Sequence, residues 1–325
     1  MVPSPLRLLR ILVPAFVMLC GPAAAEWQPT QTVRIIVPQP PGGLIDTTAR
    51  LIQPHLERAL KHPVIIDNRS GAAGIVGTDA VAKAAPDGHT LLAVAGSLTV
   101  LPAVNQRLPY DTVRDLAPVG LISKYAFLFV VNSQQVPAKT LPEFIALAKK
   151  EPGRFNYATT GQASLNHLVI EHLVHRSGIQ LQHVPYRGGA NATLAVVKGE
   201  AHLTAISPAV SGPHVEAGAL RAIATGGLVR DKQFPNAATV EESGFPGFEA
   251  ISWVALLAPG GTPKQVIDRL NAELNRALQD PDTAAKIANQ GSEVGGGTAA
   301  ELQRIIASEI RNWTDVARAA KITAQ

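Results

Sequence analysis

The chain has 325 residues, of which 46% are hydrophobic and 17% charged, and its formal net charge at pH 7 is +4. This composition supports one large core or two ordinary ones, and it excludes a disordered chain. No run of about 18 apolar residues interrupts the body of the chain, so a multi-span membrane protein is not predicted.

The first residues have the pattern of a secretory signal peptide. Arg7 and Arg10 precede a short apolar run, and residues 23–25 are three alanines that form a small-residue exit. We expect cleavage after Ala25, which leaves a mature chain that begins at Glu26. Removal of the two arginines lowers the net charge by two, so nothing in the charge balance suggests a nucleic-acid partner.

The only cysteine of the chain, Cys20, lies within this leader. A lipid-anchored form is not favoured, because a leucine rather than a small residue precedes it. The mature chain then has no thiol for a disulfide, a nucleophile or a thiolate metal site. Export without disulfides fits the periplasm, where we expect the protein to reside.

Short β-rich runs alternate with helical patterns in two successive series. In the first series, strands over 33–37, 64–66 and 90–94 are separated by helices over 44–59 and 75–84. Because these strand runs are almost continuously apolar, they indicate a parallel sheet covered on both faces. The second series predicts strands over 127–131, 156–158, 183–185, 203–206 and 220–225 and helices over 141–150, 164–176 and 192–198.

A last strand over 251–257 is followed only by helices. We expect Thr262, Asp280 and Thr298 to cap these helices, with Glu301 completing a capping box. These last elements contain a single strand and therefore do not form a third series of alternating strands and helices. The simplest interpretation is that they complete the first series. The fold class predicted is therefore α/β with two lobes. After the signal peptide (1–25), residues 26–126 and 250–325 form lobe 1 and residues 127–249 form lobe 2, which gives two chain crossings and a cleft at the carboxyl ends of the strands.

Three loops combine a strand end, a glycine-containing turn and a helix start. They are 40–43, 159–164 and 186–191. Glycine lets backbone N–H groups approach a ligand, and a helix N-terminus adds unpaired donors and partial positive charge. Together the loops suit a carboxylate, although any single one is more simply an ordinary βα connection. None has the spacing of a P-loop or a dinucleotide fingerprint, so no cofactor is predicted.

The sequence contains no clear motif for a catalytic or a metal site. His167, Glu171 and His175 share one helix face, but their spacing matches no zinc-protease pattern. We interpret them as a polar outer stripe beside a half-buried His172. No serine lies in Gly-x-Ser-x-Gly. Asp46 either caps its helix or fixes the glycine loop by accepting its N–H groups, and both alternatives stay open.

At these residues the sequence resembles the Bug family, the extracytoplasmic solute receptors of tripartite tricarboxylate transporters. The resemblance covers nearly all of the mature chain. The blocks that carry it are 34–37 with 41–50, 67–74 (Asp-Asn-Arg-x-Gly-Ala-x-Gly), 81–88, 108–111 (Leu-Pro-Tyr-Asp), 183–189 (His-Val-Pro-Tyr-Arg-Gly-Gly) and 256–263.

The resemblance implies a Venus-flytrap periplasmic-binding-protein fold that binds a small organic carboxylate in its cleft, with no cofactor or metal, and delivers it to membrane transporter subunits. We expect the protein to be a monomer. The ligand-binding residues that it implies are Pro41, Gly42, Gly43, Asp46, Ser97, Gly161, Ser164, Arg187, Gly188, Gly189, Ala190 and Ser207.

One departure bears on the ligand. Many family members have acidic residues where this chain has His202 and Ser207. A buried ammonium needs a carboxylate partner, so a ligand with a charged amine is in doubt. A ligand-sensing receptor that docks on a signalling protein would use the same clamshell. An exported α/β hydrolase is a third possibility, but it lacks a visible nucleophile–base pair.

Overall fold

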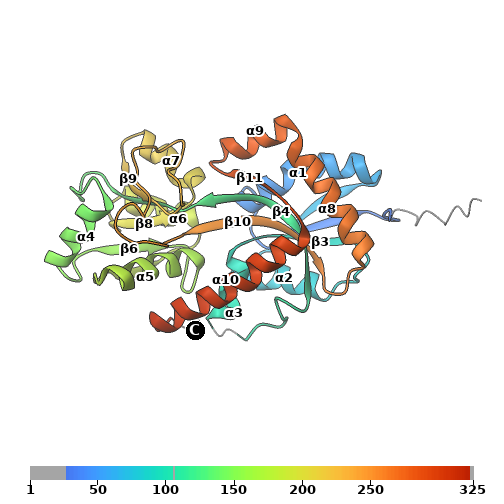
Figure 1. The fold of residues 1–325 in the computed structure, drawn as a ribbon, viewed down its shortest axis with the longest axis horizontal. Coiled ribbons are helices and arrows are strands. Elements are labelled where there is room, and N and C mark those ends of the chain that lie inside the picture. Colours follow the sequence, from blue (N-terminus) through green and yellow to red (C-terminus); the bar gives the residue numbers. More distant parts are fainter. Residues whose placement is uncertain (1–26, 105–106, 323–325) are drawn as a thin grey trace, which may run out of the picture.

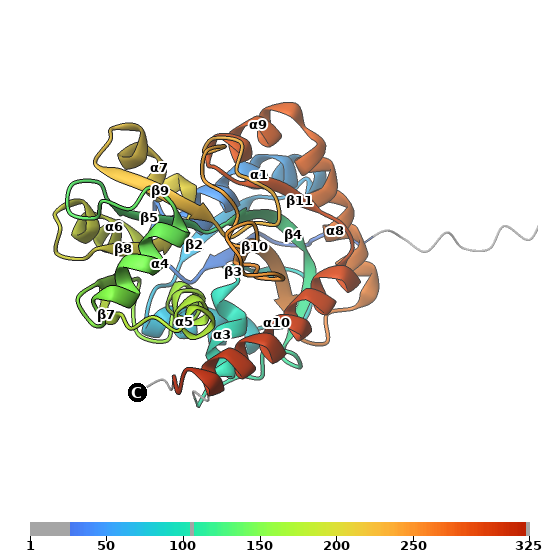
Figure 2. The same ribbon diagram turned by 60° about the vertical axis from the view of Figure 1, so that its left-hand side comes forward.

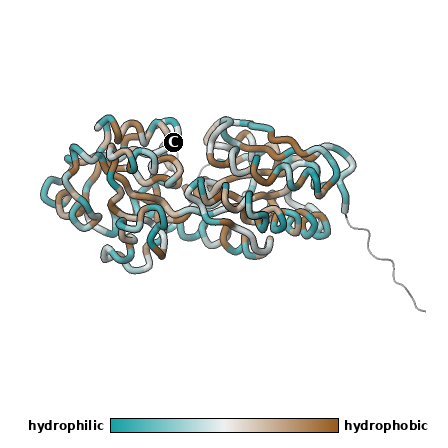
Figure 3. The backbone as a smooth tube through the Cα atoms, turned by 90° about the horizontal axis from the view of Figure 1, so that it is seen from above, coloured by the Kyte–Doolittle hydropathy of each residue, from teal (hydrophilic) through white to brown (hydrophobic). Residues whose placement is uncertain are grey.

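The computed structural model describes residues 27–104 and 107–322 of the chain. The expected signal peptide, with Cys20 and the cleavage position at Ala25, lies outside the described residues. Within them, the backbone forms two bodies that lie side by side, each built on its own sheet (Figure 1, Figure 3). The two-lobed α/β fold expected from the sequence is thereby confirmed.

In the described part of the chain, the first lobe contains a six-stranded sheet of order β11-β4-β10-β3-β1-β2. Strands β1, β2 and β3 run parallel, as predicted, whereas β10 runs antiparallel to β3 and β4 and β11 runs antiparallel to β4. The sheet is therefore mixed rather than wholly parallel. Its strands are β1 (Val33–Val37), β2 (Val64–Asn68), β3 (Thr90–Ala95), β4 (Leu116–Ala126), β10 (Ile251–Pro259) and β11 (Glu293–Gly296).

Helices cover both faces of this sheet. Successive strand residues point to opposite faces, so Ile35 packs in the apolar cluster of α1 and α8, and Ile36 packs in that of α2, α3 and α10. A 3-10 turn, η1 (Ala72–Gly74), precedes α2. The helices of this lobe are α1 (Leu44–Leu60), α2 (Ile75–Ala82), α3 (Ser97–Ala103), α8 (Lys264–Gln279), α9 (Pro281–Asn289) and α10 (Ala299–Ala319).

The second lobe contains, among the described residues, a five-stranded sheet of order β7-β6-β8-β5-β9. Phe129 packs on one face with α4 and α5, and Leu128 packs on the other with α6. Strands β7 and β8 run parallel to β6, and β5 runs antiparallel to β8 and β9. The strands are β5 (Leu128–Asn132), β6 (Asn156–Thr159), β7 (Gln182–Pro185), β8 (Leu203–Ile206) and β9 (Leu220–Thr225), and the helices are α4 (Leu141–Lys150), α5 (Leu165–Ser177), α6 (Gly189–Val197) and α7 (Pro208–Glu216).

The two chain crossings between the lobes are bonded to each other. The Phe127 N–H donates to the Ala250 carbonyl at 2.9 Å, the Gly226 N–H donates to the Phe127 carbonyl at 2.8 Å, and the Ala250 N–H donates to the Gly226 carbonyl at 2.8 Å. Helix α10 also joins the lobes, since Trp313 packs in the same cluster as α5 (Figure 2). The lobe boundaries given above stay a prediction. Because α10 packs on both lobes, its assignment to lobe 1 alone is the part of that division that this packing affects.

Two of the three expected helix caps are confirmed. Asp280 accepts from the Thr283 N–H at 2.9 Å, and Thr298 forms a capping box with Glu301. The expected cap at Thr262 is wrong. Its hydroxyl donates to the Pro259 carbonyl at 2.7 Å, within the turn that ends β10, and the helix begins two residues later.

Candidate functional site

Among the described residues, six helices follow the carboxyl ends of the parallel strands β1, β2, β3, β6, β7 and β8. These helices are α1, α2, α3, α5, α6 and α7, and none has a side-chain hydrogen bond at its N-cap. By contrast, α4, α9 and α10 are capped by Thr140, Asp280 and Thr298, whereas α8, which follows the antiparallel strand β10, has no side-chain cap. Six uncapped N-termini therefore gather at one edge of each sheet, where their N–H donors and partial positive charge suit an anion.

These two edges approach each other at the lobe interface. A Cβ on Gly96, which precedes α3, would lie 3.4 Å from Leu165 Cδ2 of α5. A Cβ on Gly42, Gly161 or Gly188 would meet no atom within 4 Å, and all three have positive φ values of 81°, 145° and 88°. Their backbone therefore faces open space, which permits close approach of a ligand.

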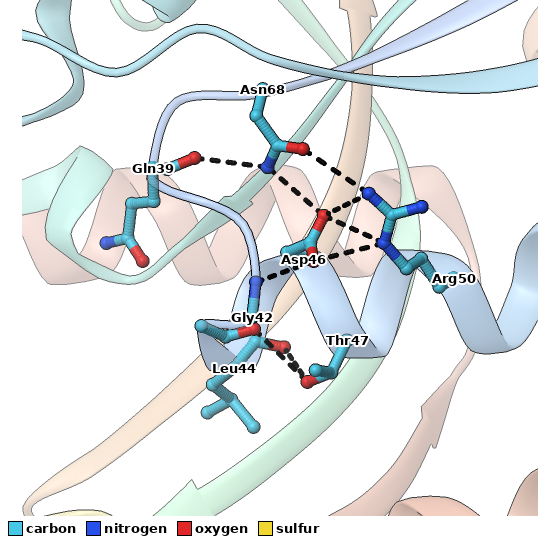
Figure 4. Close-up of polar contacts among 8 residues, drawn as sticks. Gln39, Gly42, Leu44, Asp46, Thr47, Arg50 and Asn68 are labelled. Carbon is cyan, nitrogen blue, oxygen red and sulfur yellow. Dashed lines mark hydrogen bonds and ion pairs between the residues drawn. The ribbon is translucent and has the colours of Figure 1, made fainter.

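Asp46 organises the loop at the start of α1 (Figure 4). Its Oδ2 accepts from the Gly42 N–H at 2.9 Å, and its Oδ1 accepts from the Asn68 amide at 3.1 Å. Arg50, one turn along the helix, donates to both carboxylate oxygens at 3.1 and 3.0 Å. Of the two alternatives left open by the sequence, the structure shows loop fixation, because Gly43 rather than Asp46 stands at the cap position.

The Asp46 side chain is only 2% exposed, so its charge depends on these partners. Burial alone would raise the pKa of Asp46, but the hydrogen bonds from Arg50, Gly42 and Asn68 outweigh burial and hold the pKa below its usual value. Asn68 also donates to the Gln39 carbonyl at 3.1 Å, which ties β2 to the same loop. The first-lobe loop is thus held by a carboxylate that is itself fully partnered.

The corresponding loop of the second lobe, residues 159–164, is called here the Gly161 loop. Asn166 Oδ1 accepts from the Thr160 N–H at 3.2 Å and from the Ser164 hydroxyl at 2.7 Å. The Ser164 Oγ also lies 2.7 Å from the Gly161 carbonyl, so its single proton is shared between these two acceptors. The Ser164 hydroxyl therefore closes the loop on itself instead of capping α5, which leaves the first-turn N–H groups of the helix without a side-chain cap.

Two stacked histidines lie under the Gly161 loop. The rings of His167 and His183 are 3.8 Å apart at 12°, and His167 is 4% exposed. The predicted outer stripe is therefore wrong for His167, and Glu171 is also partly buried, with a hydrogen bond from the Tyr157 hydroxyl. Helix α5 is covered by the sheet and by α10, which turns these polar residues inward. His172 is half-buried against Phe248, as predicted.

The remaining predicted residues occupy the same edges of the sheets. Arg187, Gly188 and Ala190 are exposed around the start of α6, and Gly189 and Ser97 are partly buried. Pro41 is exposed beside the first-lobe loop. Ser207 stands at the cap position of α7, where its side chain makes no capping bond, and it is 5% exposed. Ser97 begins α3 and lines a cavity of about 10 Å³ together with Gln39 and Tyr110, among other residues, which is room for about one water molecule.

His202 does not share this edge. It precedes β8 and Ser207 follows it, so the two residues lie at opposite ends of the strand, roughly 15 Å apart at the usual rise per residue. Its Nδ1 lies 2.6 Å from Asn156 Oδ1, and its ring packs edge-on against Phe155. The residue at position 202 therefore does not bear on a ligand held at the edge where Ser207 lies.

Several residues that shape these loops were not singled out from the sequence. Asn68 and His183 bond residues that are distant in sequence, Asp46 and Thr159, whereas Asn166 bonds residues of the adjacent Gly161 loop. No group of three metal-ligating side chains is found in residues 27–104 and 107–322. Within the same residues, every helix is too short or too polar to cross a membrane.

Comparison with known proteins agrees with this architecture. Residues 48–322 match the family described as TctC, tripartite tricarboxylate transporter family receptor. Protein BugT of Bordetella pertussis is 34% identical over 302 residues, which cover 92% of each chain.

Solved structures of similar proteins share the fold over nearly their whole length. A protein of R. palustris solved with adipate is 31% identical with a TM-score of 0.82, and the match covers 91% of this chain and 99% of that one. MatC from Rhodopseudomonas palustris, solved with bound malate, is 31% identical with a TM-score of 0.79, and the match covers 89% and 99%.

Proposed function

The chain belongs to the TctC family of tripartite tricarboxylate transporter receptors, and we propose that it captures a small carboxylate between its two lobes and presents it to the membrane subunits of such a transporter. It is a periplasmic solute-binding receptor by family and by fold. The family and the fold are those of receptors rather than enzymes, and we propose that the bound acid is released unchanged.

The observation that carries this proposal is the contrast among helix N-termini. The six helices at the facing edges of the two sheets have no side-chain caps, whereas three of the four other helices in the described part of the chain, α4, α9 and α10, do; α8 is the exception. A side-chain cap uses the N–H groups that a carboxylate would need, so its absence keeps these donors available. The open backbone at Gly42, Gly161 and Gly188 supports the same use.

A carboxylate ligand is also supported by the relatives solved with adipate and malate. In the present chain, one carboxylate would lie against Gly42 and Gly43 of the first lobe. The other would lie against the second-lobe loops, where the Arg187 guanidinium is exposed and able to make bidentate contacts. Closure of the lobes would strengthen these contacts by excluding water.

We further propose that the ligand has no charged amine. Ser207 offers only a hydroxyl at the edge of the second sheet. Asp46 is the carboxylate nearest to the first-lobe glycines, and it is already paired with Arg50 at 3.0 Å. An ammonium desolvated in a closed cleft would find no free carboxylate there, and its burial would cost several kcal/mol.

The site test is a thermal-shift and calorimetry panel of malate, adipate, a tricarboxylate, aspartate and glutamate. We expect binding of at least one amine-free acid, with a stabilisation of about 2.7 kcal/mol at 100 times its Kd. The Gly188→Ala variant should weaken that binding. Gly153→Ala is the matched control, since Gly153 also has a positive φ (74°) with no atom near its Cβ position but precedes β6 at the opposite edge.

Two results would contradict the proposal. Equal effects of Gly188→Ala and Gly153→Ala on affinity would mean that the ligand does not use the second-lobe edge. Selective, tight binding of aspartate or glutamate would refute the amine-free ligand class. For the expected export, the intact mass of periplasmic protein should correspond to a chain that begins at Glu26, and size-exclusion with light scattering should give a monomer.

A further inference from the structure

Three aromatic rings are stacked beneath the Gly161 loop. Tyr157 of β6 lies 5.1 Å from His183 of β7 at 25°, and His183 lies 3.8 Å from His167 of α5. The stack therefore joins the two strands and the helix from which the second-lobe edge is built. Its position suggests a role for the two histidines beyond filling the core.

Each histidine is bonded to the loop through one ring nitrogen. The Ala163 N–H donates to His167 Nδ1 at 3.1 Å. His183 Nε2 lies 2.6 Å from the Thr159 hydroxyl, which in turn lies 3.3 Å from the Gly161 N–H and 3.1 Å from the Gly161 carbonyl. The backbone at both ends of the loop thus depends on an imidazole nitrogen.

These bonds accompany an uncommon backbone conformation in the loop. Ala163 has φ = 55°, in the left-handed region that a residue with a Cβ rarely occupies. The bond to His167 also fixes the tautomer, because a backbone N–H can only donate and Nδ1 must therefore carry no proton. Burial, and then the neighbouring His183, lower the pKa of His167 to about 3, so its ring stays neutral as this bond requires.

We propose that His167 and His183 are positioning residues that hold the Gly161 loop in its carboxylate-binding form, His167 through Ala163 and His183 through Thr159. The proposal rests on the proposed function, since it assigns the loop to the ligand. Neither histidine touches the ligand. Each acts on the backbone that does, and the chemistry required is a hydrogen-bonding atom at one defined ring position.

Paired substitutions separate this role from simple core packing. Asn at position 167 places an acceptor where Nδ1 stands, and Gln at position 183 places an amide near Nε2, whereas Leu at either position fills space without a polar atom. In calorimetry with malate, or with adipate if malate does not bind, we expect His167→Leu and His183→Leu to raise Kd about tenfold or more. His167→Asn and His183→Gln should stay within about threefold of the wild type.

The matched control is His172 on the same helix. It is half-buried and stacked on Phe248 at 4.8 Å, and among the described residues it has no bond to the Gly161 loop. Both His172→Asn and His172→Leu should leave Kd unchanged. If the Leu and the polar variants at position 167 or 183 weaken binding equally, the histidines act only through packing and the proposal is overturned.

A ligand-free measurement keeps this test independent of the ligand class. Amide hydrogen exchange at Ala163 should accelerate about tenfold or more in His167→Leu and return toward the wild-type rate in His167→Asn. If no amine-free acid of the panel binds, the ligand class of the proposed function is wrong, but the exchange data still decide the positioning role. Unchanged exchange in His167→Leu would refute it.

Discussion

Glu309 is a partly buried carboxylate that forms no ion pair with the other described residues, and its replacement by glutamine should stabilise the protein above neutral pH. It projects from α10 and accepts from Trp253 Nε1 at 2.8 Å and from the Thr99 hydroxyl at 2.9 Å. Burial raises the pKa of Glu309 to about 7, and the charge of nearby Glu249 acts in the same direction, against the two hydrogen bonds. The folded protein therefore binds a proton there that the unfolded chain releases at about 4.5.

The sign of the pH dependence follows from this difference. A raised carboxyl pKa adds stability that is fully present below about pH 4.5 and is lost as the pH rises to about 7. At about 1.36 kcal/mol per pKa unit, the loss amounts to about 3 kcal/mol by pH 8. Glu309→Gln keeps the neutral form at every pH, so its stability advantage over the wild type should grow from near zero at pH 4.5 to about 3 kcal/mol at pH 8.

The hydrogen bonds favour this substitution. The Trp253 N–H can only donate, so it selects the carbonyl oxygen of glutamine and turns the amide NH₂ toward the Thr99 hydroxyl. Thr99 then accepts from the amide and donates to the Gly96 carbonyl, which already lies 2.7 Å away. The variant therefore leaves none of these groups without a partner.

Denaturant titrations of wild type and variant at pH 5, 6, 7 and 8 measure the difference directly. Thermal unfolding gives a second measurement. At pH 8 the melting temperature of Glu309→Gln should exceed that of the wild type by about 6 °C, at roughly 2 °C per kcal/mol for a chain of this size. The exposed Glu57→Gln on α1 serves as control and should give a curve parallel to the wild type. A Glu309→Gln advantage that is the same at pH 5 and pH 8, or a less stable variant at pH 8, would refute this account.

Three further predictions concern the first-lobe loop, the buried histidine and the last helix. Asp46→Ala removes the acceptor of the Gly42, Arg50 and Asn68 donors, so it should cost on the order of 1–3 kcal/mol by denaturant titration and weaken acid binding; unchanged stability and affinity would show that Asp46 does not hold the first-lobe loop. Because the pKa of His167 is lowered to about 3, the stability that its neutral ring contributes is complete above about pH 6.5 and is lost as the pH falls. His167→Asn should therefore make the free energy of unfolding fall less steeply below pH 6.5. A decline as steep as in the wild type would contradict this prediction. Thr298→Ala should cost about 1 kcal/mol through loss of the capping box, and a smaller effect than that of Thr262→Ala would be inconsistent with the observed caps.

Local patterns were sufficient for most of the fold. Continuous apolar runs marked the parallel strands, and the first-lobe loop with Asp46 was recognisable because all of its partners except Asn68 lie within four residues. Strands β4 and β11 were missed; β11 is short and contains two glycines. Helices α3 and α7 were missed because each is short and contains an internal proline, which argues against a helix in sequence terms.

The features that sequence could not supply depend on contacts between distant segments. Thr99 and Glu309 are 210 positions apart, so nothing in the pattern of α10 distinguishes this glutamate from an exposed one. The burial of His167 likewise depends on the sheet on one side of α5 and on α10 on another. Helical periodicity locates a polar residue on a face, but tertiary packing decides whether that face meets water.

Side-chain caps explain why the candidate site was only partly visible in the sequence. Glycine at positions 43 and 188 cannot cap with a side chain, so those two helix starts could be recognised as having free N–H groups. Ser164 and Ser207 are good capping residues by type, and a sequence argument would assign their hydroxyls to the helix. In the structure the Ser164 hydroxyl lies within hydrogen-bond distance of the Gly161 carbonyl and of Asn166 instead. Whether a helix start remains available for an anion is therefore decided by competition for one hydroxyl, which only the folded loop resolves.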